Sequence, residues 1–400
     1  MLYKKIILNS LKMKSLSNKY YLFFIFFAIL LTLIFLREPC WFIEGSLKAY
    51  DFSYYKQGKL KSFSDNLFFI YPGQGALSFW TNLTHSTISL FPINTAKILA
   101  SYLNLMIYLF IFIYIYFAKS ILFKNYKHKI FAIFIILLSP PMTPEIWMSS
   151  AHLREYFGIL GFILLFQNFE NDKILVNKIT NFLIFFSGIC SIYAAALTPA
   201  YFLKFYLSKN KVDLNRFIFA SFAFLIQSFV VVYFILTNLS DTPRFNFDLS
   251  IFYSYFYNVP IRSFFGSTIP KFLFVETEIY KIQYFNFLVY ALFIFGLVIT
   301  LLYLNKKRDK ISNKIIFSLI LVSSLIILGT IQSGFVGGRY AVVPGVILIF
   351  LVFRLFLIEK NLVLKKIFLS LLVFSLVAGS FEYRYFSPLP QSLKCEKNNS

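Results

Sequence analysis

The chain has 400 residues, of which 58% are hydrophobic and 14% are charged, and its formal net charge is +22. Soluble domains are nearer half apolar and one quarter charged, so this composition excludes an ordinary soluble protein. Long runs with hardly a charge predict an all-α fold, a polytopic bundle of membrane-spanning helices. We expect one integral membrane domain over residues 1–400.

Eleven apolar segments in the chain predict membrane spans. A span needs roughly 20 residues, so the short segments 129–140 and 199–207 are expected to be tilted, broken or half-spanning. The first span starts after a basic segment, but "LREPCWFIEGS" follows it without a small-residue cleavage site, which favours a retained span over a signal peptide. The predicted spans are 20–36, 98–118, 129–140, 154–168, 180–196, 199–207, 216–236, 284–304, 315–331, 342–358 and 365–381.

Lysine and arginine cluster before the first span and in alternate loops. Basic loops mark the cytoplasmic side, so this pattern predicts a cytoplasmic N-terminus and an external C-terminal tail. The excess positive charge is then a topology signal, and no nucleic-acid partner is expected. The predicted cytoplasmic clusters are Lys4, Lys5, Lys12, Lys14 and Lys19; Lys119, Lys124, Lys127 and Lys129; Lys173 and Lys178; Lys209, Lys211 and Arg216; Lys306, Lys307, Arg308, Lys310 and Lys314; and Lys360, Lys365 and Lys366.

Two large external segments are predicted, 37–97 and 237–283, and the first is the more informative. It contains "REPCWFIEGSLKAYDFSYYKQG". A continuous helix over 41–57 would separate polar from apolar side chains, which predicts an amphipathic helix lying at the membrane interface with its carboxylates toward external solvent. Its polar face would carry Glu44, Lys48, Asp51 and Tyr55, and its lipid face Phe42, Leu47, Tyr50 and Tyr54.

The two carboxylates on that polar face are candidate catalytic groups. Glu44 or Asp51 could take a proton from a hydroxyl as a general base, or hold a divalent metal through oxygen ligands. The alternative is an exposed Glu44–Lys48 pair, worth a few tenths of a kcal/mol and without function. Further along, His85 is either a base or ligand, or a hydrogen-bonded interfacial histidine.

Three further external stretches supply candidate binding residues. In "PPMTPEIWMSSAHLREYFG", His152 and Arg154 either line a substrate cleft or serve helix capping and snorkelling. In "SGFVGGRYAVVPG", Arg339 is suited to a phosphate through paired hydrogen bonds, with snorkelling to lipid headgroups as the alternative. Arg384, after the last span, adds a second cation.

Other ionisable or reactive residues carry weaker predictions. Lys204 and Arg354 lie inside predicted spans near their cytoplasmic ends, so they are expected to snorkel and to have no function. The cysteines share no metal-type spacing, so no zinc site is expected. Cys40 and Cys395 are both external on this topology and could form a disulfide in an oxidising compartment.

The "REP…W.IEG…YYKQG…YPGQG" run and the later "GGRY…P" run resemble the C-type (GT-C) superfamily of polytopic membrane glycosyltransferases, in a bacterial branch. The resemblance implies an inner-membrane enzyme that passes a sugar from a polyprenyl-phosphate carrier to a lipid or glycan acceptor on the external face. It places Glu44 at the catalytic acid, with Asp51 in reserve, and Arg339 at the carrier phosphate. Many members have two adjacent acids in this loop, whereas Gly45 follows Glu44 here, so a divalent metal stays an open question.

Two alternatives remain at this point. A surface-polysaccharide polymerase or ligase uses similar substrates, but its usual large, Arg-rich late loop contrasts with the few cations of 237–283. A transporter or flippase predicts ionisable groups at the bilayer midplane and paired broken helices. The short segments 129–140 and 199–207 keep that second reading open.

Overall fold

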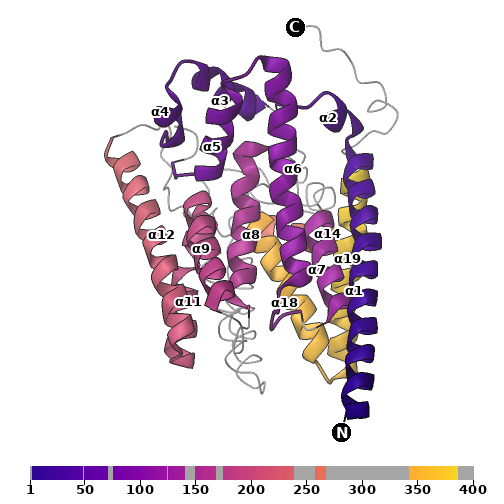
Figure 1. The fold of residues 1–400 in the computed structure, drawn as a ribbon. Coiled ribbons are helices and arrows are strands. Elements are labelled where there is room, and N and C mark those ends of the chain that lie inside the picture. Colours follow the sequence, from indigo (N-terminus) through magenta and orange to yellow (C-terminus); the bar gives the residue numbers. More distant parts are fainter. Residues whose placement is uncertain are drawn as a thin grey trace, which may run out of the picture.

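The computed structural model of the protein is helical (Figure 1). It describes residues 2–47, 49–70, 75–123, 125–139, 149–167, 174–237, 257–266 and 342–385, and within these ranges no strand occurs. The regular backbone is what an apolar sequence requires, because helices satisfy their own N–H and C=O groups without water.

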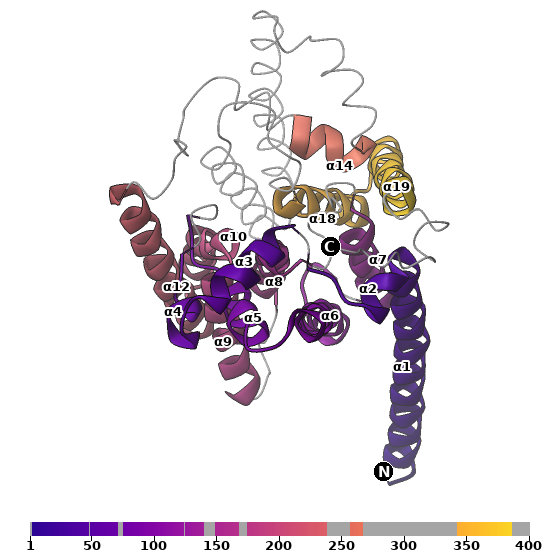
Figure 2. The same ribbon diagram turned by 90° about the horizontal axis from the view of Figure 1, so that it is seen from above.

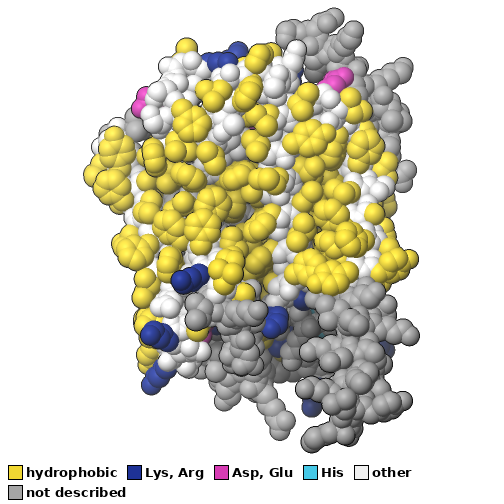
Figure 3. All heavy atoms as spheres, viewed as in Figure 1, with side chains coloured by type: hydrophobic (Ala, Val, Ile, Leu, Met, Phe, Trp, Pro, Cys, Tyr) yellow, Lys and Arg dark blue, Asp and Glu magenta, His cyan; other side chains and the backbone are white. Residues whose placement is uncertain are grey.

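Four described helices are long and apolar enough to cross a membrane. Their apolar stretches, of 18 to 25 residues, match the roughly 20 that a bilayer core requires. Hydrophobic side chains cover much of the molecular surface in one broad band (Figure 3). The chain is therefore a helical membrane protein. The four helices are α1 (Leu2–Arg37), α6 (Ile93–Phe117), α12 (Lys211–Leu236) and α19 (Leu362–Tyr385), with apolar stretches Tyr20–Arg37, Ile93–Phe117, Lys211–Phe234 and Leu362–Tyr383.

Shorter helices overlap five more of the predicted apolar segments, although the predicted 180–196 is divided after Cys190 into α9 and α10; segments 284–304 and 315–331 lie outside the described residues. Small helices fill the connections between them. The apolar ones are α7 (Tyr126–Leu138), α8 (Leu153–Leu165), α9 (Ile174–Cys190), α11 (Thr198–Ser208) and α18 (Val342–Ile358). The small ones are α2 (Pro39–Ile43), α3 (Ala49–Lys59), α4 (Phe63–Leu67), α5 (Phe79–Ile88), η1 (Ser150–His152), α10 (Ile192–Ala195), η2 (Tyr257–Ile261) and α14 (Arg262–Phe265).

Helix α8 lies at the centre of the bundle, and each of its residues is buried. It packs against α9, α10, α18 and α6 (Figures 1 and 2). Two glycines on α8 allow the closest contacts, because a Cβ at Gly158 or Gly161 would lie 2.9 Å from a Cβ of α10. Helices α2 to α5 cover one end of the bundle, which we call the capped end, and α1 begins at the opposite end (Figure 1).

The contact between α9 and α12 gives a first testable prediction. A Cβ at Gly188 would lie 2.4 Å from the Cβ of Ala223, so Gly188→Ala must push the two helices apart. We expect the variant to lose about 1–3 kcal/mol of unfolding free energy, the usual cost of overpacking. Melting temperatures in detergent measure this, and adding Ala223→Gly should restore part of the loss. Equal melting of Gly188→Ala and wild type would contradict the close contact.

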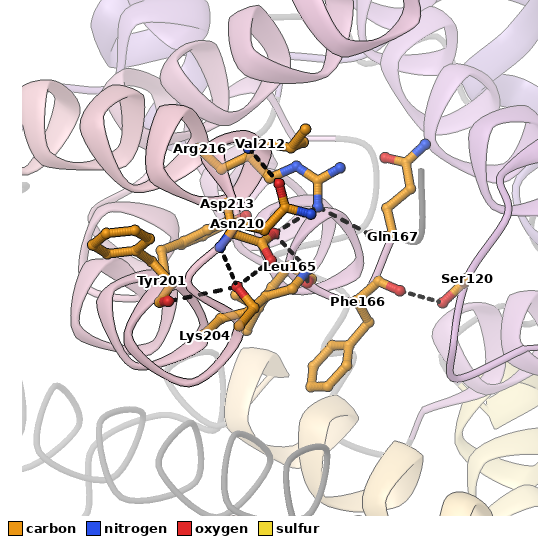
Figure 4. Close-up of polar contacts among 12 residues, drawn as sticks. Ser120, Leu165, Phe166, Gln167, Tyr201, Lys204, Asn210, Val212, Asp213 and Arg216 are labelled. Carbon is orange, nitrogen blue, oxygen red and sulfur yellow. Dashed lines mark hydrogen bonds and ion pairs between the residues drawn. The ribbon is translucent and has the colours of Figure 1, made fainter. Parts of the chain in front are cut away.

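A buried ion-pair network holds the opposite end of the bundle together (Figure 4). Asp213 Oδ1 lies 3.4 Å from Lys204 Nζ and 3.2 Å from Arg216 Nη1. The two cations also donate to carbonyls at this end of α8: Lys204 to Leu165, the last residue of the helix, at 2.6 Å, and Arg216 to Gln167, two residues beyond it, at 3.1 Å. Lys204 thereby satisfies an orphan carbonyl, and both cations lie at the negative end of the α8 dipole.

The prediction that Lys204 and Arg354 snorkel to solvent is not what the fold shows. The Lys204 side chain is largely enclosed and committed to Asp213 and the α8 terminus, and Arg354 is buried on α18. Because Lys204 is near the end of a predicted span, the sequence indicates that its ammonium can reach the membrane surface. The sequence does not indicate that α8 ends beside Lys204 with a carbonyl that needs a donor.

Candidate functional site

The first-loop helix predicted over 41–57 is wrong: the segment forms two helices, α2 and α3, with a sharp turn between them. Gly45 has φ +70°, and a Cβ there would lie 2.4 Å from the backbone nitrogen of Ile98 on α6. Only glycine tolerates both the conformation and the close approach. The break separates Glu44 from Asp51, and Lys48 lies outside the described residues.

Glu44 is the C-cap residue of α2, and its side chain is exposed. The backbone on either side of it is tied to α6: the Ser46 N–H donates to Ser101 Oγ at 3.0 Å, and the Tyr102 hydroxyl donates to the Phe42 carbonyl at 3.2 Å. Within the described part of the chain, its carboxylate has no hydrogen-bond or ion-pair partner. Glu44 therefore combines a fixed backbone with an accessible carboxylate.

Asp51 is on α3 but does not face solvent as predicted; it is 1% exposed. Its Oδ1 accepts the Ala151 N–H at 2.9 Å and lies 3.5 Å from His85 Nε2 on α5. Tyr54, expected to face lipid, is buried too, with its ring edge-to-face with the imidazole of His85. The i to i+4 spacing correctly predicted a shared face for Asp51 and Tyr55, but that face is the buried one.

Burial acts to raise the pKa of the Asp51 carboxyl, because a charge is poorly solvated there. The hydrogen bond and charge of His85 and the Ala151 N–H outweigh it, and the pKa is held below its usual value of 3.8. Asp51 is therefore ionised at neutral pH.

This ionisation gives a pH-dependent prediction. A depressed folded-state pKa contributes stability that is present above the unfolded value, 3.8, and is lost as pH falls through the folded value. Asp51→Asn keeps an acceptor for Ala151 but loses the charge, so at pH 7 it should cost about 1–2 kcal/mol. Melting curves of both proteins against pH measure the effect. A melting gap that fails to narrow between pH 4 and pH 2 would contradict it.

The turn η1, which carries His152, is fastened by three separate helices (Figure 2 shows α3 and α5 over this end of α8). Asp51 on α3 accepts the Ala151 N–H, as above. On α5, the Thr81 hydroxyl donates to the Ser150 carbonyl at 2.7 Å. On α6, Asn104 and the Ser150 hydroxyl exchange two hydrogen bonds of 3.0 and 3.1 Å. Such over-determination is typical of a site whose geometry must be held.

His152 and Arg154, both predicted site residues, meet at Glu155 in the first turn of α8. Glu155 Oε1 lies 3.1 Å from Arg154 Nε and 3.7 Å from His152 Nδ1. Glu155 is 0% exposed, and its Oε2 has no hydrogen-bond partner among the described residues. Nothing in the spacing of Glu155 in the sequence indicates that it is buried between a cation and a histidine.

Helix α6 brings the Glu44 loop and the His152 turn together. Ser101 holds the loop after Glu44, and Asn104 holds η1. These two residues are three apart, so they share a helix face at a rise of about 4.5 Å. The exposed carboxylate and the buried polar cluster, which we define as Asp51, His85, His152, Arg154 and Glu155, are therefore anchored to the same turn of one helix.

One buried cation has no signal in the sequence. Arg37, the last residue of α1, is buried, and its guanidinium carbon lies 4.3 Å from the ring centroid of Tyr383 on α19. Tyr383 in turn donates to the Leu33 carbonyl at 2.8 Å. The position of Arg37 at the end of a span resembles snorkelling, which is why the sequence gave no signal of an interior cation.

The remaining predicted residues are placed only in part. Arg339 lies outside the described residues; Arg384 lies on α19, but its side chain is not described. Cys40 is disulfide-bonded, Cys190 is a free buried cysteine, and Cys395 lies outside the described residues. Within the described ranges, no group of three or more His, Cys, Asp or Glu could hold a metal ion.

No family model, no characterised protein and no solved structure matches this chain.

Proposed function

We propose that the chain is an inner-membrane glycosyltransferase that takes a sugar from a polyprenyl-phosphate carrier and passes it to a lipid or glycan acceptor on the external face. The observation that carries the proposal is the shared anchoring of Glu44 and the buried polar cluster on one turn of α6. It supports a reaction centre made of an accessible carboxylate beside a preorganised, charged interior, at the end of the bundle where the first loop folds back.

The topology belongs to the same proposal. About eleven spans, a cytoplasmic N-terminus and an external C-terminus place the capped end outside. Most of the Lys and Arg side chains visible in Figure 3 lie below the apolar band, toward the end where α1 begins, and this supports the orientation. The site then lies at the external surface of the bilayer, so a carrier with a long apolar chain can reach it without leaving the membrane.

The proposed step inverts the anomeric centre. The acceptor hydroxyl oxygen attacks the anomeric carbon, the bond between that carbon and the carrier phosphate oxygen breaks, and its electron pair leaves with the phosphate. Glu44 takes the hydroxyl proton, because it is the accessible carboxylate of the pair. Arg154 offsets the charge gathering on the phosphate, and Arg339 and Arg384 are proposed to assist.

Asp51 has a different role in this scheme. Its carboxylate is committed to Ala151 and His85, so it positions the η1 turn and does not reach substrate. Glu155 holds Arg154 and His152 in the same way. A metal is not needed for this step, since proton removal and phosphate stabilisation are both assigned to side chains.

Transfer and transport can be separated by one pair of assays. Purified protein in vesicles is supplied with a radiolabelled polyprenyl-phosphate hexose or pentose and with membrane lipid extract as acceptor. Label appearing in a new lipid or glycan supports the transferase. If the label crosses sealed vesicles unchanged, the protein is a flippase instead. If the protein transfers a whole oligosaccharide from a lipid-linked oligosaccharide supplied in place of the single-sugar donor, it is a polymerase or ligase instead.

A further inference from the structure

An apolar groove lies between the first-loop segment, α9 and α12, away from the polar cluster. Its volume is about 510 Å³, within the roughly 300–1,000 Å³ of ligand pockets. Its walls include Phe68, Leu77, Ile189, Phe229, Val230 and Tyr233. Nothing in the proposed transfer step uses this groove.

The groove opens at the level of the membrane. Its α12 wall includes Phe229 and Val230, which belong to the apolar stretch Lys211–Phe234. Phe229 is 73% exposed, so the mouth faces the surrounding hydrocarbon and not water. The apolar band continues over this side of the molecule, around the capped end of α12 (Figure 3). An alkyl chain of the bilayer is therefore the chemistry that the groove meets.

The wall opposite α12 is held in place by a buried amide. Gln227 accepts the Leu77 N–H at 3.1 Å and donates to the Leu77 carbonyl at 2.8 Å and the Gly188 carbonyl at 3.0 Å. A glutamine inside an apolar span is costly unless its hydrogen bonds are satisfied, and here they are. The groove is thus preformed, which lowers the entropy cost of binding a chain.

The rim at the capped end is basic. Lys61 Nζ lies 2.9 Å from the ring centroid of Phe69, the residue after Phe68 in the groove wall. Lys59, two residues before Lys61, is in the last turn of α3, with its Nζ 5.6 Å from the Tyr55 ring centroid. Asp65, the acid of the described 59–70 segment, accepts the Ser62 hydroxyl at 2.6 Å. Two lysines against one carboxylate leave net positive charge where a headgroup would lie.

We propose that this groove binds one membrane phospholipid with an anionic headgroup. An acyl chain lies along Leu77, Ile189 and Val230, and the headgroup phosphate pairs with Lys61 and Lys59. The argument rests on continuity between the groove and the bilayer and on charge complementarity at its rim. The site is separate from the transfer step and does not depend on the proposed function.

The test counts lipids retained by the purified protein. The protein is reconstituted in nanodiscs of mixed phosphatidylcholine and phosphatidylglycerol, released, and analysed by native mass spectrometry. Wild type should retain one phosphatidylglycerol. Val230→Trp fills the groove and should abolish retention, whereas Val232→Trp, on an exposed position of the same helix, should not. The double variant Lys59→Gln, Lys61→Gln should lower the preference for phosphatidylglycerol about tenfold.

Three results would overturn the proposal. The first is that wild type retains no lipid or retains both phospholipids equally. The second is that Val230→Trp and Val232→Trp behave alike, because the groove would then not be the place of binding. The third is that polyprenyl phosphate displaces phosphatidylglycerol at equal concentration, which would assign the groove to the carrier. Melting temperatures of all variants identify any that fail to fold, and Val230→Phe replaces Val230→Trp in that case.

Discussion

Glu44→Gln is expected to lower the rate of sugar transfer by about 10²–10⁴-fold, the usual contribution of a positioned general base. The amide has the same shape but cannot take the acceptor proton. Because the Glu44 side chain is exposed and has no partner among the described residues, folding and donor binding should persist. The effect should therefore fall on kcat, with KM little changed. The measurement is steady-state transfer from a radiolabelled polyprenyl-phosphate sugar.

The matched control is Asp65→Asn, which removes another exposed carboxylate from the same loop. It should transfer sugar at nearly the wild-type rate. If Glu44→Gln keeps full activity while folding normally, the assignment of Glu44 as the base fails. If Asp51→Asn instead loses activity while its melting temperature is unchanged, the catalytic role belongs to Asp51.

Asp213→Leu is expected to destabilise the fold by about 3–5 kcal/mol, the cost of leaving buried charges without their partner. Lys204 and Arg216 would both stay in a low-dielectric interior without a counter-charge. Since whole domains are stable by about 5–15 kcal/mol, much of the variant should fail to accumulate as folded protein. Size-exclusion chromatography in detergent and thermal melting measure the outcome.

Two further variants serve as controls for Asp213→Leu. Asp65→Leu removes an exposed carboxylate and should cost below about 1 kcal/mol. Replacing Lys204 and Arg216 with Met together with Asp213→Leu should recover only part of the stability, because both cations also bond carbonyls at the end of α8. Wild-type melting of Asp213→Leu alone would show that the network contributes little.

The apolar segments show which structural features can be predicted from local sequence. Helix α18 covers the stretch predicted as 342–358, and α11 extends one residue beyond each end of the predicted 199–207, whereas α1 begins 18 residues before the predicted 20–36. A run of apolar side chains predicts a helix because no other backbone satisfies its polar groups in a bilayer. That argument needs no knowledge of neighbours, so it holds for each segment by itself.

The candidate site shows which features local sequence does not predict. Helical spacing correctly predicted that Asp51 and Tyr55 share a face, but it assigned that face to solvent. Periodicity tells which residues point together, and not whether another element covers them. Arg37 was missed for the same reason, since Tyr383, the aromatic ring beside its guanidinium, lies on α19 and comes from far along the chain.

The sequence by itself determined that this chain is a membrane protein made of helices, because the composition and the length of the apolar runs decide whether the chain is stable in water or in a bilayer. Only the tertiary structure decided what each ionisable residue does. The chain breaks at Gly45 where it approaches α6, Glu44 is left accessible, and Asp51 faces His85 on α5 and the η1 turn. Burial and pairing depend on two surfaces that meet. A single stretch of sequence describes only one of those two surfaces.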